Sequence, residues 1–168
     1  MTTWQITFSD RFNYSQYDDL IFPIALSSDI QTQILVRVKL DTGSTFCVFQ
    51  PSYAELLEIE IEKGNLQRIR TATGSFTAYG HEITMIVGEL EWQAVVYFAE
   101  DEFFPVNVVG RVGFLDRLKI GLVDYEQLLY LSACAEVWTH FVFLRLCRFR
   151  SAVSASPRRQ ILLILMRL

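Results

Sequence analysis

The sequence predicts an all-β domain of the barrel type, followed by a tail of different composition. Up to about residue 132, the 168-residue chain consists of short apolar runs separated by turn residues, with only two short helical patterns. The chain is 51% hydrophobic and 14% aromatic, so it can bury a core. We expect residues 1–17 to be an N-terminal extension, residues 18–132 to fold, and residues 133–168 to form a basic, apolar tail.

The first expected strands lead into a motif that carries a carboxylate. Leu20–Ser27 is an apolar run broken by Pro23, which suits an edge strand. Residues 31–40 alternate between apolar and polar, as in a strand with one buried face. This strand runs directly into the sequence Asp41-Thr42-Gly43-Ser44. Pro51 then opens a short helical pattern, because proline suits the first turn of a helix.

The second half of the domain is predicted to contain a hairpin, further strands and one more helix. Leu66–Thr73 and Phe76–Val87 form the arms of the hairpin, which turns near Gly74-Ser75. Phe114–Lys119 is expected to be a short helix. The remaining strands are expected at Leu90–Ala99, Asn107–Val109, Ile120–Asp124 and Gln127–Leu131.

The charge distribution argues against nucleic-acid binding by the domain. Residues 1–131 hold 18 acidic and 9 basic residues, a net charge of −9. Residues 132–168 hold one acid and six arginines, a net charge of +5. The acidic body contains no basic stripe with interleaved aromatic residues, which a nucleic-acid-binding domain would need.

Cysteine and histidine usage indicates neither a disulfide framework nor a metal site. Cys47, Cys134 and Cys147 have no C-x-x-C spacing, and the histidines are His81 and His140. We therefore expect no metal and no cofactor. The polar, acidic N-terminal sequence lacks the basic start and apolar run of a secretory signal, so we expect a cytoplasmic protein.

The Asp41-Thr42-Gly43-Ser44 sequence places a carboxylate on a tight turn at the end of a strand. Gly43 lets the backbone fold back, and Thr42 offers a hydroxyl that can tie the turn to neighbouring backbone. Two such carboxylates held close together share one proton, so that one acts as a base toward water and the other as an acid. Taken alone, the motif is equally compatible with a solvated Asx-type turn.

The sequence resembles that of the retropepsin-like aspartic proteases, including the bacterial branch of that family, in two segments: this motif and a later one. The matching parts are the apolar strand QILVRVKL with its Asp41–Ser44 motif, and the Asn107–Arg111 segment followed by GFLDRLK. In that family an apolar-apolar-glycine segment packs beneath the D-T-G loop, and here it corresponds to Val109, Gly110 and Arg111. The resemblance covers residues 18–132 and implies a closed barrel with a flap hairpin.

The resemblance also implies a homodimeric endopeptidase that cleaves peptide or protein substrates. The chain has one D-T-G motif, so a pair of catalytic carboxylates requires two copies of Asp41 on a two-fold axis. A mobile flap covers the site in family members, and Thr73, Gly74 and Ser75 are its candidate turn here. Viral members of the family differ from this chain in having an acidic partner for the arginine that follows the later glycine. We expect Arg111 to form a bracing ion pair, with Asp116 as the candidate partner.

Two other hypotheses compete with the protease. The same fold could serve as a peptide-binding or dimerisation module without turnover. Alternatively, the tail could lie on a membrane as an amphipathic helix, since neither of its apolar runs has the about 20 residues needed to span a bilayer. The tail could also be a non-native extension produced by a change of reading frame.

Overall fold

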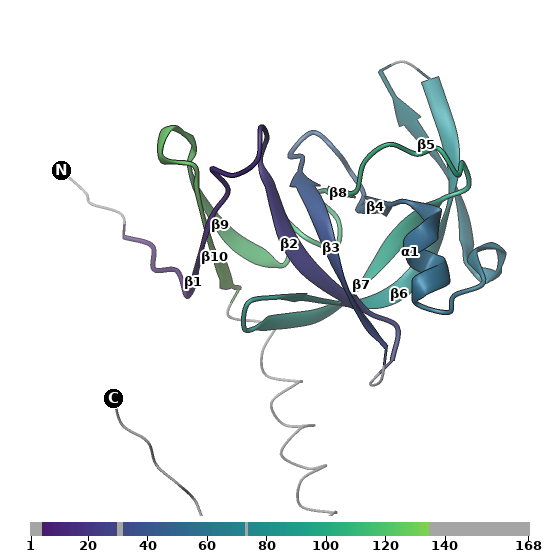
Figure 1. Ribbon diagram of the computed structural model, residues 1–168, viewed down its shortest axis with the longest axis horizontal. Coiled ribbons are helices and arrows are strands. Elements are labelled where there is room, and N and C mark those ends of the chain that lie inside the picture. The colour runs from purple at the N-terminus through teal and green to yellow at the C-terminus, as the bar shows by residue number, and fades with distance from the viewer. Residues whose placement is uncertain (1–4, 30–31, 73, 135–168) are drawn as a thin grey trace, which may run out of the picture. The chain divides into compact units, whose positions relative to one another are not determined.

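The computed structural model describes residues 5–29, 32–72 and 74–134, and its ribbon is shown in Figure 1. The described chain is an all-β domain, as predicted. One short helix, α1 (Pro51–Leu56), begins at the predicted proline, and single 3-10 turns cover Ile61–Lys63 and Asp124–Glu126. The strands are β1 (Asp10–Asn13), β2 (Ile21–Ser27), β3 (Gln33–Leu40), β4 (Val48–Phe49), β5 (Asn65–Thr71), β6 (Gly74–Val87), β7 (Leu90–Ala99), β8 (Val108–Val109), β9 (Leu118–Val123) and β10 (Leu128–Ala133).

Seven strands form a sheet that closes on itself as a barrel. Their order is β2-β3-β8-β4-β7-β6-β5, and an additional pairing of β2 with β6 closes the ring. β3 pairs in parallel with β8, and β4 pairs in parallel with β7, whereas the other pairings in this sheet are antiparallel. β5 pairs with β6 outside the ring. The β5–β6 hairpin therefore projects from the barrel (Figure 1).

The barrel core follows from the alternation in the strand sequences. Val36, Val38 and Leu40 of β3 are buried, whereas Leu35 between them is 74% exposed. β7 likewise buries every second residue from Leu90 to Phe98. The largest fully buried side chains include four aromatic rings, Phe22, Phe49, Phe98 and Phe114. Burying these apolar faces fixes the register of each strand, because a slip of one residue would turn the apolar set toward solvent.

A second, three-stranded sheet is formed by β1, β10 and β9 in that order. β1 lies within residues 1–17, where we expected an extension, and it pairs with β10 from Asp10↔Leu131 to Asn13↔Leu128. The Tyr14 side chain that follows is only 3% exposed. Its hydroxyl donates to the Asp124 carboxylate at 2.7 Å. Residues 10–14 therefore belong to the folded body.

Three local expectations differ from the structure or are refined by it. The helix expected at Phe114–Lys119 is absent; residues 113–117 form successive turns, and Leu118 already begins β9. The hairpin reverses between Thr71 and Gly74, before the predicted Gly74-Ser75 turn. Pro23 lies in β2, beyond the Ala25–Ser27 segment that pairs with β6, so its missing N–H breaks no pairing with that strand. The tail from residue 135 onward lies outside the described residues.

Candidate active site

The Asp41 loop is a tight turn held by its own backbone and carboxylate. The carboxylate Oδ1 accepts a hydrogen bond from the Gly43 N–H at 2.8 Å, and the Ser44 N–H donates to the Asp41 carbonyl at 3.2 Å. A Cβ on Gly43 would lie 3.2 Å from Asp41 Oδ1, tighter than an ordinary contact. Asp41 is half-buried at the end of β3. The turn therefore fixes the orientation of the carboxylate at the end of a rigid strand.

The segment that begins with β8 lies directly against this loop, as the sequence resemblance implied. The Asp41 N–H donates to the Val109 carbonyl at 3.0 Å, and the Arg111 N–H donates to the Ser44 carbonyl at 2.9 Å. A Cβ on Gly110 would lie 2.5 Å from the Phe46 carbonyl oxygen and 2.7 Å from that of Ser44. Since both are backbone atoms, only glycine fits at this crossing. Val109 and Gly110 thus pack under the loop.

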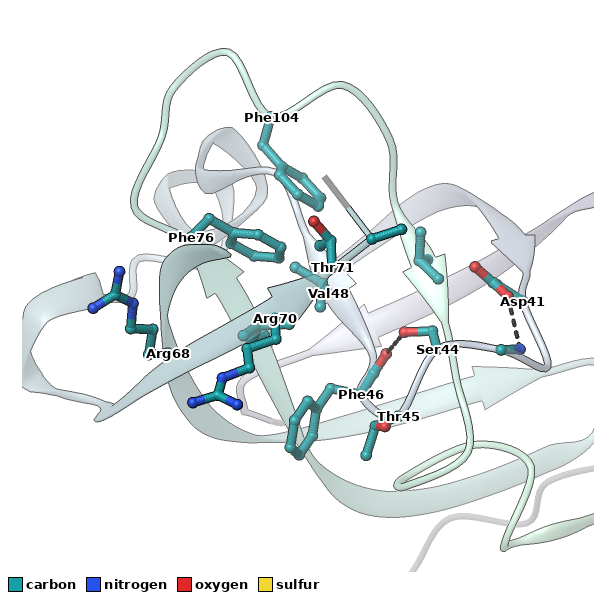
Figure 2. Close-up of a pocket in the computed structure, with 14 residues that line it drawn as sticks. Asp41, Ser44, Thr45, Phe46, Val48, Arg68, Arg70, Thr71, Phe76 and Phe104 are labelled. Atoms are coloured by element: carbon teal, nitrogen blue, oxygen red, sulfur yellow. Dashed lines mark hydrogen bonds between the residues drawn. The ribbon is translucent and has the colours of Figure 1, made fainter. Parts of the chain in front are cut away.

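The predicted supporting side chains of the loop occupy different environments. The Ser44 hydroxyl donates to the Phe46 carbonyl at 2.8 Å and so stabilises the loop, as Figure 2 shows. Thr42 is exposed, and its hydroxyl makes no hydrogen bond with the described residues. The tie to neighbouring backbone that we expected from Thr42 is therefore not formed within residues 5–29, 32–72 and 74–134.

Among the described residues, Arg111 does not form the expected ion pair. Arg111 is exposed, whereas we expected a bracing pair with Asp116. The Asp116 carboxylate instead accepts the Gly113 N–H at 2.9 Å and lies 3.6 Å from Arg117 Nε. The Asp116 backbone N–H donates to the Arg111 carbonyl at 2.9 Å, but the Asp116 carboxylate is engaged by Gly113, whose φ of +95° interrupts the predicted helix. Within the described chain, the Arg111 backbone supports the loop and its side chain faces solvent.

A cleft of about 690 Å³ lies between the Asp41 loop and the projecting hairpin. Asp41 and Gly43–Phe46 form one wall, and Arg68–Ala72 of the hairpin contribute another. Phe76 and Phe104 also line the cleft, with ring centroids 5.0 Å apart (Figure 2). Asp41 is the one acidic side chain among the described residues that line it. The hairpin predicted to be the flap thus faces the cleft that contains Asp41.

The flap residues that contact the cleft differ from those we named. Gly74 and Ser75 are exposed at the start of β6, and Thr73 lies outside the described residues. The cleft is lined by the preceding strand, β5, and by the Phe104 loop. The arginines of β5 were missed, although the alternation that places Arg68 and Arg70 on one face of a strand is visible in the sequence.

Part of this chain is similar to a known family, and its fold is similar to that of a solved structure. Residues 29–103, which include Asp41 and the hairpin, match the family model of aspartyl proteases. A retropepsin-like aspartic protease from Rickettsia conorii is similar in structure, with a TM-score of 0.53 at 17% identity over 73% of this chain and 98% of that one. This chain has the retropepsin-like aspartic protease fold. The resemblance of the sequence to that family is thereby confirmed.

EIAV protease complexed with the inhibitor HBY-793 matches with a TM-score of 0.46 at 16% identity, over 60% of this chain and 88% of that chain. No curated protein matches the sequence. In the part of the chain that the structure describes, no helix is long and apolar enough to cross a membrane.

Proposed function

We propose that this chain is an aspartic endopeptidase that works as a homodimer, with one Asp41 carboxylate from each copy. The observation that carries this proposal is the position of Asp41, which is fixed on the D-T-G turn and faces the cleft under the hairpin. The match to the aspartyl protease family over residues 29–103 supports a hydrolase of peptide bonds. The barrel shared with the Rickettsia conorii enzyme supports the same assignment at the level of fold.

The proposed mechanism needs two carboxylates and no cofactor. The Gly43 N–H engages Asp41 Oδ1, and in the proposed mechanism Oδ2 is the oxygen that contacts the attacking water. Two carboxylates close together cannot both ionise, so the pair holds one proton and titrates as a unit. The ionised carboxylate removes a proton from the water as it attacks the peptide carbonyl. The protonated carboxylic acid then donates its proton to the substrate.

The projecting hairpin supplies the peptide-binding part of the proposed site. An extended peptide in the cleft can pair with exposed backbone of β5 as an added strand. Closing the hairpin over the peptide would exclude bulk water from the reacting atoms. Activity is expected to be highest at acidic pH, because the pair has to retain its proton.

The first test replaces Asp41 by asparagine, which keeps the shape of the side chain but removes its proton chemistry. We expect cleavage of an unfolded protein mixture to fall at least about 1,000-fold, because the only proposed base is lost. Asp18→Asn is the matched control, since Asp18 is an exposed acid that does not line the cleft. Sedimentation should show the same dimer content for all three proteins. Equal activity of wild type and Asp41→Asn would contradict the proposal, and a wild type that is dimeric but inert would favour a binding module.

A further inference from the structure

The two long faces of the projecting hairpin differ in chemistry. Ile69 of β5 pairs with Phe76 of β6, whose ring packs against Phe104, so one face is apolar. Arg68 and Arg70 lie on the other face, because alternate residues of a strand point to opposite sides. Figure 2 shows these arginines extending from β5 on the side away from Phe76 and Phe104. The cleft thus combines an apolar side with a cationic side.

The two arginines are available to a ligand. Arg68 Nε donates to the Ser75 hydroxyl at 3.0 Å, which anchors its stem across the hairpin. Neither arginine forms an ion pair with an acid of the described chain, and both are exposed. A guanidinium remains charged at every working pH and presents paired donors that match a carboxylate.

The positive charge is local and contrasts with its surroundings. Residues 1–131 carry a net charge of −9, yet two of their nine basic residues lie on this one strand and line the cleft. Three acidic residues at positions 100–102 shortly precede Phe104 in the sequence, but they do not line the cleft. Glu100 instead accepts a hydrogen bond from the Tyr79 hydroxyl at 3.4 Å. An anionic group of a ligand would therefore bind on the β5 side of the cleft, where Arg68 and Arg70 lie.

We propose that the cleft selects peptides that carry an acidic side chain a few residues from the scissile bond. Arg70 is the main specificity-determining residue, and Arg68 makes a smaller contribution to binding the same acidic side chain. Arg70 directly precedes Thr71 and Ala72, which also line the cleft, and Figure 2 draws its side chain between those of Arg68 and Phe46. The apolar side takes the neighbouring large apolar side chain. This inference rests on the proposed protease function. In a two-fold dimer, one Arg70 lies on each side of the scissile bond, so acidic residues on both sides should contribute.

The test uses three peptides that share a central pair of phenylalanines and differ only in the flanking residues, which are glutamate, glutamine or lysine. Wild type should cleave them with kcat/KM in that order, with each favourable side contributing about 2- to 5-fold, as is usual for exposed charge pairs. Added salt should reduce the preference. Arg70→Gln should abolish most of the preference, and Arg70→Glu should reverse it. Arg11→Glu, on β1 away from the cleft, makes the same charge change and should leave the order unchanged.

A binding measurement separates this inference from the proposed function. Fluorescence anisotropy of the three labelled peptides with Asp41→Asn protein reports recognition without turnover. Tighter binding of the glutamate peptide, lost in the Asp41→Asn/Arg70→Glu double variant, supports the inference even if wild type cleaves nothing. Equal binding of the glutamate and lysine peptides, or a glutamate preference that survives Arg70→Glu, would overturn it.

Discussion

Cys47 lies buried directly beneath the Asp41 loop, in a position that makes its thiol inert. Its side chain is 0% exposed, and its sulfur accepts the Gly110 N–H at 3.5 Å. Burial raises the pKa of the Cys47 thiol from 9.0 to about 12, and the nearby Asp116 carboxylate adds to the increase, although the Gly110 N–H opposes it. Cys47 is therefore a small core residue and not a reactive thiol.

The raised pKa of Cys47 predicts slow alkylation and a loss of stability in alkali. The thiolate is the reactive form, so iodoacetamide at pH 8.5 should leave Cys47 unmodified in the native protein and modify it after unfolding in urea. The folded state keeps a proton that the unfolded state releases above about pH 9. The contribution of the neutral thiol is therefore complete below pH 9 and is lost as the pH rises toward 12. The free energy of unfolding should fall less over this range in Cys47→Val. Equal alkylation rates in native and unfolded protein would contradict this prediction.

At the level of single residues, the sequence predicted the position of Asp41 better than the surroundings of its neighbours. The place of Asp41 on a turn at the end of a strand could be predicted because strand, aspartate and glycine are contiguous in the chain. The cationic side of the cleft could not, because its arginines come to line the same cleft as the Asp41 loop only when the hairpin folds over a loop some 25 positions away in sequence. The expected pairing of Arg111 with Asp116 was also mispredicted, since the Asp116 carboxylate accepts the Gly113 N–H instead.

Among the secondary-structure elements, the strands with clear alternation were predicted well. β7 has the predicted bounds, and β3 carries the predicted buried face. The segment after β8 was mispredicted because its apolar spacing resembles a helix. In the structure, the buried Trp92 indole donates to the Gly113 carbonyl at 2.8 Å, which ties this segment to β7 by a contact that local sequence does not reveal. β1 was missed because its pairing partner, β10, lies more than 100 residues away.

The crossing of β8 and the Asp41 loop makes a prediction about glycine. Gly110→Ala should destabilise the domain by roughly 1–3 kcal/mol and lower activity, because the new methyl group would meet two backbone carbonyl oxygens. Gly74→Ala is the matched control, since a Cβ there meets nothing within 4 Å, and its effect should stay within about 0.5 kcal/mol. Urea denaturation measures both. A Gly110→Ala variant as stable as Gly74→Ala would show that the crossing is looser than described.

For the whole molecule, the central claim is that function requires two copies of the chain. The described chain contains one D-T-G turn, and its Asp41 is the one acidic side chain among the described residues that line the cleft; the proposed mechanism needs two such carboxylates. The sequence predicted this organisation from the presence of one D-T-G motif. The dimer itself stays a prediction, because nothing in one chain tests it. Its strength determines the concentration at which activity appears.

The most direct test mixes wild type with Asp41→Asn at constant total chain concentration until the subunits have exchanged. If both carboxylates are needed, only wild-type dimers are active, and an equal mixture should retain about one quarter of the wild-type rate under random pairing. Asp18→Asn in place of Asp41→Asn should leave the rate unchanged, which controls for exchange itself. A rate of about one half, proportional to the wild-type fraction, would mean that each chain works alone and would contradict the account.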